Sequence, residues 1–285
     1  MKRRSGSIRA KLLPAAAFCL IILLWWGLSA SGIVPAYMLP SPADVTRAFI
    51  HDFPNLMAHA RVSVTEAIYG LLIGTALAFG LACVMDRFLV MEEAVLPLLV
   101  ASQTIPTIAI APLLVLWMGF GMEPKITLVV VTTFFPIAVG LLDGFKSADP
   151  DAVALLRSMG AKRTQIFRHV KIPAALPYFF SGLRISASYA VVGAVISEWL
   201  GGFEGLGVYM TRVRKAYAFD KMFAVILLIM IVSLLLMEAV NVIRDLSLPW
   251  LRYRSDTGKT AGREREPRRL ENHRPRENRR KDLKR

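Results

Sequence analysis

The chain has 285 residues, of which 55% are hydrophobic, and the apolar residues are gathered in long runs. This composition, with a mean hydropathy of +0.48, excludes an ordinary water-soluble domain and indicates a protein that crosses a membrane several times. A formal net charge of +14 is also found in nucleic-acid-binding proteins, but much of this charge lies in the C-terminal tail. Cys19 and Cys83 lie inside apolar runs, which indicates neither a disulfide framework nor a cysteine metal site.

The N-terminal residues 1–11 are basic, and an apolar run follows from about Leu12 to Leu28. This pattern fits a cleavable signal peptide with Leu28-Ser29-Ala30 as its cleavage site, or a first membrane span that is retained. Because several more apolar runs follow, we favour a retained span with the basic arm as a cytoplasmic anchor.

Residues 33–60 are mixed in polarity and contain four prolines, which predicts an external loop with short interfacial helices. His51 and His59 have no carboxylate or cysteine cluster at ligand spacing, so we expect both at the surface. The second span runs from about Val62 to Met85. Within it, Gly70 and Gly74 begin a stripe of small residues that predicts close approach of another helix.

Charged residues near the ends of these spans are interpreted as interfacial. Glu66 lies near the outer end of the second span, and we expect it to reach the membrane interface. Lys125 is expected where the loop after the third span ends. No paired charges are expected in the middle of the membrane.

The third span, from about Ala94 to Met118, is unusual because a polar run precedes Pro106, and Pro112 follows one and a half turns later. A proline frees a carbonyl group, which in lipid must be satisfied by protein or water. This predicts a broken, polar span that faces a cavity; the alternative is a proline-kinked packing helix. A fourth span ends near Leu142 and repeats the theme more weakly.

The fifth span is expected from about Tyr178 to Leu200 and the sixth from about Phe223 to Val242. Glu198 ends the fifth span, and we interpret it as lining the outer part of a pathway or as an anchor between subunits. The candidate pathway residues are Gln103, Thr104, Pro106, Thr132, Thr133, Ser186 and Glu198.

The segment 201–207 is rich in glycine but lacks the Gly-Lys-Ser/Thr ending of a phosphate loop, so it predicts a turn at the start of an outer loop. No ATP-binding motif occurs in the chain. The outer loop is expected to continue through Arg212 and Lys215.

The distribution of lysine and arginine places both termini and the loop between spans four and five in the cytoplasm. The basic residues of the last outer loop, Arg212, Arg214, Lys215 and Lys221, count against this arrangement. The tail, residues 249–285, has too few apolar residues to fold and is predicted to be disordered. We expect it to be merely solvated; attraction to anionic membrane lipid is a second possibility and RNA binding a weaker one, so no nucleic acid is expected as a partner.

The stretch from Asp149 to Pro177 is a polar island between apolar runs. Asp149 is a good N-cap, Pro150 suits a first helical position, and Gly160 suits the left-handed end of a helix. The spacing predicts a short amphipathic helix over 149–160 whose apolar side needs a partner groove. The alternative is an interfacial helix that lies on lipid. Its apolar side comprises Ala152, Val153, Leu155, Leu156 and Met159.

The order of helix, Gly160-Ala161, Ile172-Pro173 and Leu176-Pro177 resembles the cytoplasmic loop of ABC importer permeases. The family's usual Glu-Ala-Ala triplet would fall on residues 154–156, where this chain has Ala-Leu-Leu. Segments between Pro112 and Tyr209 are similar to the nitrate/sulfonate/taurine branch of these permeases, and most similar to the thiamine-precursor (hydroxymethylpyrimidine) group.

This resemblance implies an all-α protein of about six spans with the MetI-like fold of type I ABC importers, working as a homodimer in the bacterial inner membrane. It implies cytoplasmic ABC ATPase subunits, a solute-binding protein on the outer face, and neither catalysis nor a cofactor in this chain. It also implies that the helix at 149–160 couples ATP hydrolysis to transport. The residues expected to make this contact are Asp149, Leu155, Leu156, Arg157, Met159, Gly160, Ala161 and Arg163.

The opposing function class is a secondary transporter or channel driven by an ion gradient, which would be expected to carry paired charges at mid-membrane and internal repeats. For the importer, a pyrimidine thiamine precursor is the favoured solute, and sulfonate, taurine or nitrate is the alternative.

Overall fold

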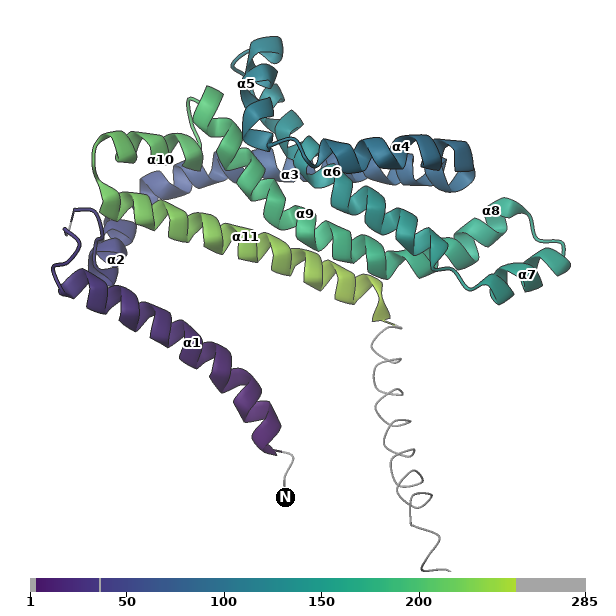
Figure 1. Ribbon diagram of the computed structural model, residues 1–285, viewed down its shortest axis with the longest axis horizontal. Helices are drawn as coiled ribbons and strands as arrows, with labels where there is room; N and C mark the ends of the chain where they lie inside the picture. The colour runs from purple at the N-terminus through teal and green to yellow at the C-terminus, as the bar shows by residue number, and fades with distance from the viewer. Residues whose placement is uncertain (1–3, 36, 250–285) are drawn as a thin grey trace, which may run out of the picture. The chain divides into compact units, whose positions relative to one another are not determined.

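The computed structural model describes residues 4–35 and 37–249, and side chains are described from Leu13 onward. It comprises one unit that ends at Val240 and a second that begins at Asn241. Helices make up the described chain, with no strand among them (Figure 1). The elements are α1 (Arg4–Ala30), α2 (Pro42–His51), α3 (Phe53–Arg87), α4 (Leu89–Ser102), α5 (Thr107–Met118), α6 (Glu123–Lys146), α7 (Pro150–Ser158), α8 (Arg163–Ile166), the π-helical turn η1 (Phe167–Lys171), α9 (Ile172–Gly201), α10 (Leu206–Lys215) and α11 (Phe219–Ser247).

The prediction of about six spans is confirmed by the length and hydropathy of the helices. Five segments of the described chain are long and apolar enough to cross a membrane: within α1, α3, α6, the continuous run from α8 to α9, and α11. The pair α4 and α5 passes the same test together, although the two helices are bent by 99° at a short break. Counted as one span, this bent pair gives the sixth, and the break lies at the polar run before Pro106 where the sequence predicted it.

Several helices begin earlier than hydropathy predicted. The third span was expected from Ala94 but its first helix starts at Leu89, and the fifth was expected from Tyr178 but its helix starts at Arg163. Pro173 does not interrupt the fifth span, because it lies in the first turn of α9, directly after the wider π-helical turn. Pro173 and Pro177 therefore lie within the helix of this span and not before it.

The three central helices α3, α6 and α9 pack against one another through small residues (Figure 1). An added Cβ at Gly70 of α3 would overlap the side chain of Val129 in α6, and one at Gly74 would lie 2.6 Å from Thr133 Oγ1. The predicted stripe of small residues is thus confirmed as the α3–α6 contact. Near the C-terminal end of α6, an added Cβ at Gly144 would lie only 2.6 Å from the Ala175 Cα atom in α9, so this glycine permits the close contact of α6 with α9.

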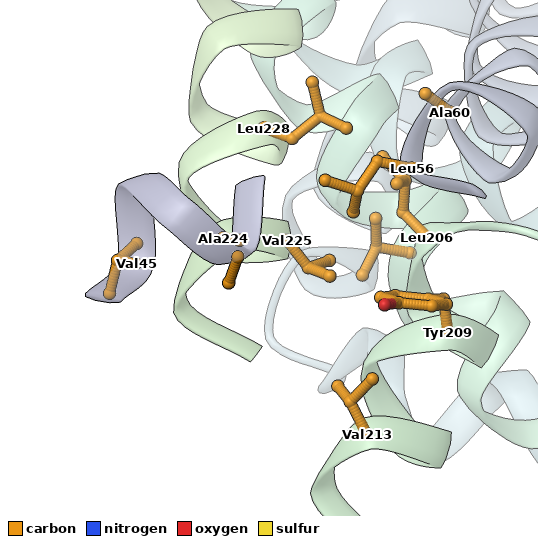
Figure 2. Packing of buried hydrophobic residues seen from close by; sticks show 11 residues of the cluster. Val45, Leu56, Ala60, Leu206, Tyr209, Val213, Ala224, Val225 and Leu228 are labelled. Atoms are coloured by element: carbon orange, nitrogen blue, oxygen red, sulfur yellow. The ribbon is translucent and has the colours of Figure 1, made fainter. Parts of the chain in front are cut away.

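A separate apolar cluster joins α2, α3, α10 and the first half of α11 (Figure 2). In Figure 2 the Tyr209 ring lies between Leu206 and Val213 of α10, with Val225 of α11 nearby. Residues 206–215, predicted as part of an outer loop, are therefore helical. The prediction was wrong because the apolar positions 206, 209 and 213 follow helical spacing and have a core to pack against.

Helix α2 is held at its start by a capping box. The Ser41 hydroxyl donates to Asp44 Oδ2 at 2.7 Å and accepts from the Asp44 backbone N–H at 3.2 Å. These bonds from Ser41 hold the pKa of the Asp44 carboxyl below its ordinary value. A short helix within residues 33–60 is thus confirmed, although residues 53–60 belong to the long helix α3.

Candidate functional site

The predicted amphipathic helix is α7, between the last residue of α6 and the first turn of α8 (Figure 1). Asp149 caps it, because its Oδ1 accepts a hydrogen bond from the Asp151 backbone N–H at 2.9 Å. At the other end Gly160 has φ +80°, and the Ala161 N–H donates to the Leu156 carbonyl at 3.0 Å. The helix is therefore closed at both ends by its own sequence.

The apolar side of α7 is divided into a covered and an uncovered part. Val153 and Leu156 are half-buried, whereas Leu155 is 62% exposed and Met159 is 74% exposed. Two large apolar side chains, one turn apart on a short helix, are thus left without a covering element in the described chain. Such a pair is the mark of a surface that meets another protein or a lipid.

The covered part of α7 borders a cleft of about 720 Å³ that reaches the end of α3. Polar contacts span this region: an Arg163 N–H donates to the Arg87 carbonyl at 3.0 Å, and Lys171 Nζ lies 2.6 Å from Asp86 Oδ1. Arg157 and Ala161 also line the cleft. The segment after α7 is therefore fastened to α3 as well as continuous with α9.

Charged residues meet at the opposite end of the central helices. Lys125 Nζ in α6 lies 2.7 Å from Glu66 Oε1 in α3, and the two residues are only 7% and 1% exposed. The interpretation of Glu66 as an interfacial charge and of Lys125 as a loop residue is wrong, because each neutralises the other inside the bundle. The expectation that no paired charges lie in the middle of the membrane stays a prediction, because Lys125 belongs to the first turn of α6.

Glu198 of α9 lies beside this pair and organises the glycine-rich segment. Its Oε1 accepts from the Ser63 hydroxyl at 2.5 Å, and its Oε2 accepts from the Gly207 N–H at 2.6 Å. The Ser63 oxygen in turn accepts from the Leu206 N–H at 2.8 Å. Gly205 has φ +121°, and any Cβ there would overlap the Glu198 carboxylate. The carboxylate thus ties α9 to α3 and to the start of α10.

Two further contacts join the same region. The Gly205 N–H donates to His59 Nδ1 at 3.1 Å, and the His59 ring lies 5.2 Å from the ring of Tyr209. The Tyr209 hydroxyl donates to Asp52, which also lies 3.6 Å from Lys221. His51 is exposed as expected. The expectation for His59 is wrong, because it is half-buried and packed against α10.

The candidate pathway residues fall into two groups. Gln103, Thr104 and Pro106 lie at the break between α4 and α5 and are exposed. Thr133 and Ser186 are fully buried, with the Ser186 hydroxyl donating to the Thr133 carbonyl at 2.7 Å. Thr132 is half-buried and Glu198 is 1% exposed. The three residues at the break are therefore exposed, whereas Thr132, Thr133, Ser186 and Glu198 lie wholly or partly within the contacts between helices.

A comparison with known protein families decides what kind of bundle this is. Residues 53–253, more than half of the chain, match the family described as "binding-protein-dependent transport system inner membrane component". The chain belongs to this family. It is a permease subunit of an ABC importer and a multi-pass membrane protein.

The permease also has similar curated relatives. It is 37% identical over 242 residues to the formylaminopyrimidine transport permease protein ThiX of Halalkalibacterium halodurans, covering 84% of this chain and 96% of that protein. It is 25% identical over 257 residues to the taurine transport system permease protein TauC of Escherichia coli, covering 88% and 94%. The predicted resemblance to this branch of permeases is confirmed.

A solved structure supports the fold independently. The permease aligns with a chain of the inward-facing MetNI methionine ABC transporter at a TM-score of 0.55 and 20% identity, covering 68% of this chain and 94% of that one. This likeness confirms the predicted type I importer fold.

Sequence reasoning missed the buried cluster at Glu198 of the permease, although a signal for it was present. Residues 56, 63, 70 and 74 of α3 are spaced by helical turns and are all buried, and Glu66 falls on the same side four positions before Gly70. Because Glu66 lies in the stripe of small residues, the spacing alone predicts that it is buried beside a partner.

Proposed function

We propose that the permease works as a homodimer with two ABC ATPase subunits at its cytoplasmic face and a solute-binding protein at its outer face. ATP-driven closure of the ATPases would be transmitted through α7 and would rock the spans between inward-open and outward-open states. The observation that carries this proposal is a capped amphipathic helix with Leu155 and Met159 exposed, joined directly to two membrane spans.

The contact with the ATPase would centre on Leu155 and Met159, with Leu156 at its edge. Gly160 and Ala161 fix the exit of the chain from α7, and Asp149 fixes its entry. The Arg157 and Arg163 guanidinium groups are placed to pair with acidic side chains at the rim of such a contact. In this proposal the apolar residues provide affinity and the arginines provide orientation.

Movement of α7 would be passed to three spans together. The helix follows α6 and leads through α8 into α9, and the segment after it is fastened to α3 by the contacts of Arg163 with Arg87 and of Lys171 with Asp86. At the far end, the Glu198 bonds to Ser63 and Gly207 tie α9, α3 and α10. Such ties support a rigid-body movement over independent sliding of the helices.

The topology that serves this proposal has α7 and both termini in the cytoplasm of a bacterial cell. This topology follows from the number of lysine and arginine residues near the ends of the spans. The segment between α6 and α9 contributes Arg157, Lys162, Arg163 and Arg168 to that number. The basic tail would lie on the same side; it falls outside the described residues.

For the solute, we propose a pyrimidine precursor of thiamine. The support is the 37% identity to ThiX, whose name gives formylaminopyrimidine as its cargo. Import of taurine or another sulfonate is the alternative, supported by the lower identity of 25% to TauC.

Membership of the importer family disfavours the opposing function class, a secondary transporter, although the buried Lys125–Glu66 pair is a feature that such a transporter would also show. The experiment that separates the classes uses the permease reconstituted in vesicles with its ATPase and binding protein. Uptake with ATP and without an ion gradient supports the proposal, whereas uptake that requires an ion gradient and does not depend on ATP contradicts it.

A further inference from the structure

The cleft of about 720 Å³ between the end of α3 and the α7–α8 segment has mainly apolar walls. Its volume falls within the range of small-molecule sites. Leu155 and Met159, the exposed pair proposed to meet the ATPase, do not line it, so the cleft is separate from that contact. The large apolar side chains that do line it are Val84, Phe88, Val153, Ile166 and Phe167.

Positive charge outweighs negative charge around this cleft. Arg87, Arg157 and Arg163 line it, and none of the three makes an ion pair within the described part of the chain. Lys171 also lines it, but its Nζ lies 2.6 Å from Asp86 Oδ1 and neutralises the one carboxylate among the described lining residues. Three arginines without a counter-charge around an apolar hollow are suited to a ligand that is both anionic and apolar.

The cleft lies at the end of a membrane span. Its lining includes Cys83 and Val84 near the end of α3, a helix that is long and apolar enough to cross a membrane and that ends at Arg87. The chain continues with Leu89 and Val90, which are apolar and 66% and 76% exposed. In the proposed topology this end of α3 lies in the cytoplasmic leaflet, where anionic lipid headgroups attract basic side chains.

We propose that the cleft binds one anionic phospholipid of the cytoplasmic leaflet. Its phosphate group would be held by Arg87, Arg157 and Arg163, because the planar fork of an arginine matches phosphate oxygens. Its hydrocarbon would cover the apolar walls near Val84 and Phe88, which removes them from water. Inorganic phosphate would satisfy the arginines but leave these walls in water, which favours the phospholipid as the occupant.

The bound phospholipid would add a connection between α3 and the α7–α8 segment, beside the hydrogen bond from Arg163 to the Arg87 carbonyl. The position of α7 would then depend on the lipid composition of the membrane as well as on the ATPase. The site goes beyond the proposed function, because only the choice of the cytoplasmic leaflet rests on that function.

The test uses full-length permease purified from membranes together with the ATPase that accompanies it. Native mass spectrometry counts the phospholipid bound after incubation with phosphatidylglycerol or with phosphatidylcholine. Arg87→Gln should lower the affinity for phosphatidylglycerol about fivefold, the effect of one basic residue near anionic lipid. Arg87→Lys should lower it only about twofold, because the charge is kept and the fork is lost. Arg61→Gln is the matched control, since Arg61 is also an exposed arginine of α3 without an ion pair in the described chain but does not line the cleft.

The amount of ATPase is measured in the same samples. Weaker phosphatidylglycerol binding by Arg87→Gln than by Arg61→Gln, with the amount of ATPase unchanged, supports the site. Equal binding by the two variants overturns it, as does equal binding of the two lipids by the wild type.

Two further outcomes identify another occupant and also overturn the site. Release of phosphatidylglycerol by an excess of inorganic phosphate would show that the arginines hold a free anion. Loss of the ATPase from Arg87→Gln would show that the cleft receives acidic side chains of that subunit. Absence of the ATPase from the wild-type sample contradicts the proposed function alone, because the lipid count still upholds or overturns the site.

Discussion

The Lys125 ammonium group of α6 lies 2.7 Å from the Glu66 carboxylate of α3, although 59 positions separate the two residues in the chain. Both are buried, so each charge depends on the other for compensation. With the Glu198 bonds beside it, this ion pair fixes how the α10 end of the bundle is assembled.

Removal of one partner from this pair should be costly. Lys125→Met leaves Glu66 buried and uncompensated, and we expect it to destabilise the fold by about 3–5 kcal/mol. The double variant Glu66→Gln/Lys125→Met should recover more than half of that loss, because no lone charge remains. Thermal unfolding of the purified protein in detergent measures both. A Lys125→Met variant as stable as the wild type would show that the pair contributes nothing.

The contact between α3 and α6 can be tested with a matched pair of variants, because Gly70 and Gly80 lie on the same helix but only Gly70 faces α6. Gly70→Ala places a methyl group in the side chain of Val129 and should destabilise by about 1–3 kcal/mol. Gly80→Ala is the matched control: a Cβ there has no atom within 4 Å, and it should be neutral or slightly stabilising. Equal unfolding midpoints for the two variants would contradict the packing described here.

The end of α7 is tested at Gly160. Its φ of +80° strains a β-branched residue but suits asparagine, and no neighbouring atom lies within 4 Å of an added Cβ. Gly160→Val should therefore leave the permease inserted but lower ATP-driven uptake about 5–30-fold, the factor that corresponds to 1–2 kcal/mol of strain. Gly160→Asn should retain most of the uptake. Vesicle uptake and ATP hydrolysis are measured together, and normal uptake by Gly160→Val would count against the role of α7.

The spans and α7 were open to prediction because their signals are local. Long apolar runs report membrane helices directly, and an Asp-Pro start with a glycine end reports the bounds of a short helix. The break between α4 and α5 was also predictable, because a polar run before Pro106 is poorly compatible with a straight helix in lipid.

What could not be predicted depends on contacts between distant segments. The partner of Glu66 is 59 positions away and that of Glu198 is 135 positions away, and single-sequence periodicity does not connect such positions. Helix α10 was missed because its basic residues and the glycines before it suggested a loop, although positions 206, 209 and 213 carried the helical spacing.

ATP-driven transport by this permease requires, in the proposed mechanism, that the exposed apolar side of α7 binds a separate ATPase. Met159→Asp places a charge at the most exposed apolar residue of that helix, whereas Ala154→Asp makes the same change on the side turned away. The direct measurement is the amount of ATPase that co-purifies with each full-length variant from membranes. We predict that Met159→Asp lowers this amount about tenfold or more, as for a buried interface anchor, while Ala154→Asp retains it. Undiminished binding of the ATPase by Met159→Asp would contradict the proposed role of α7.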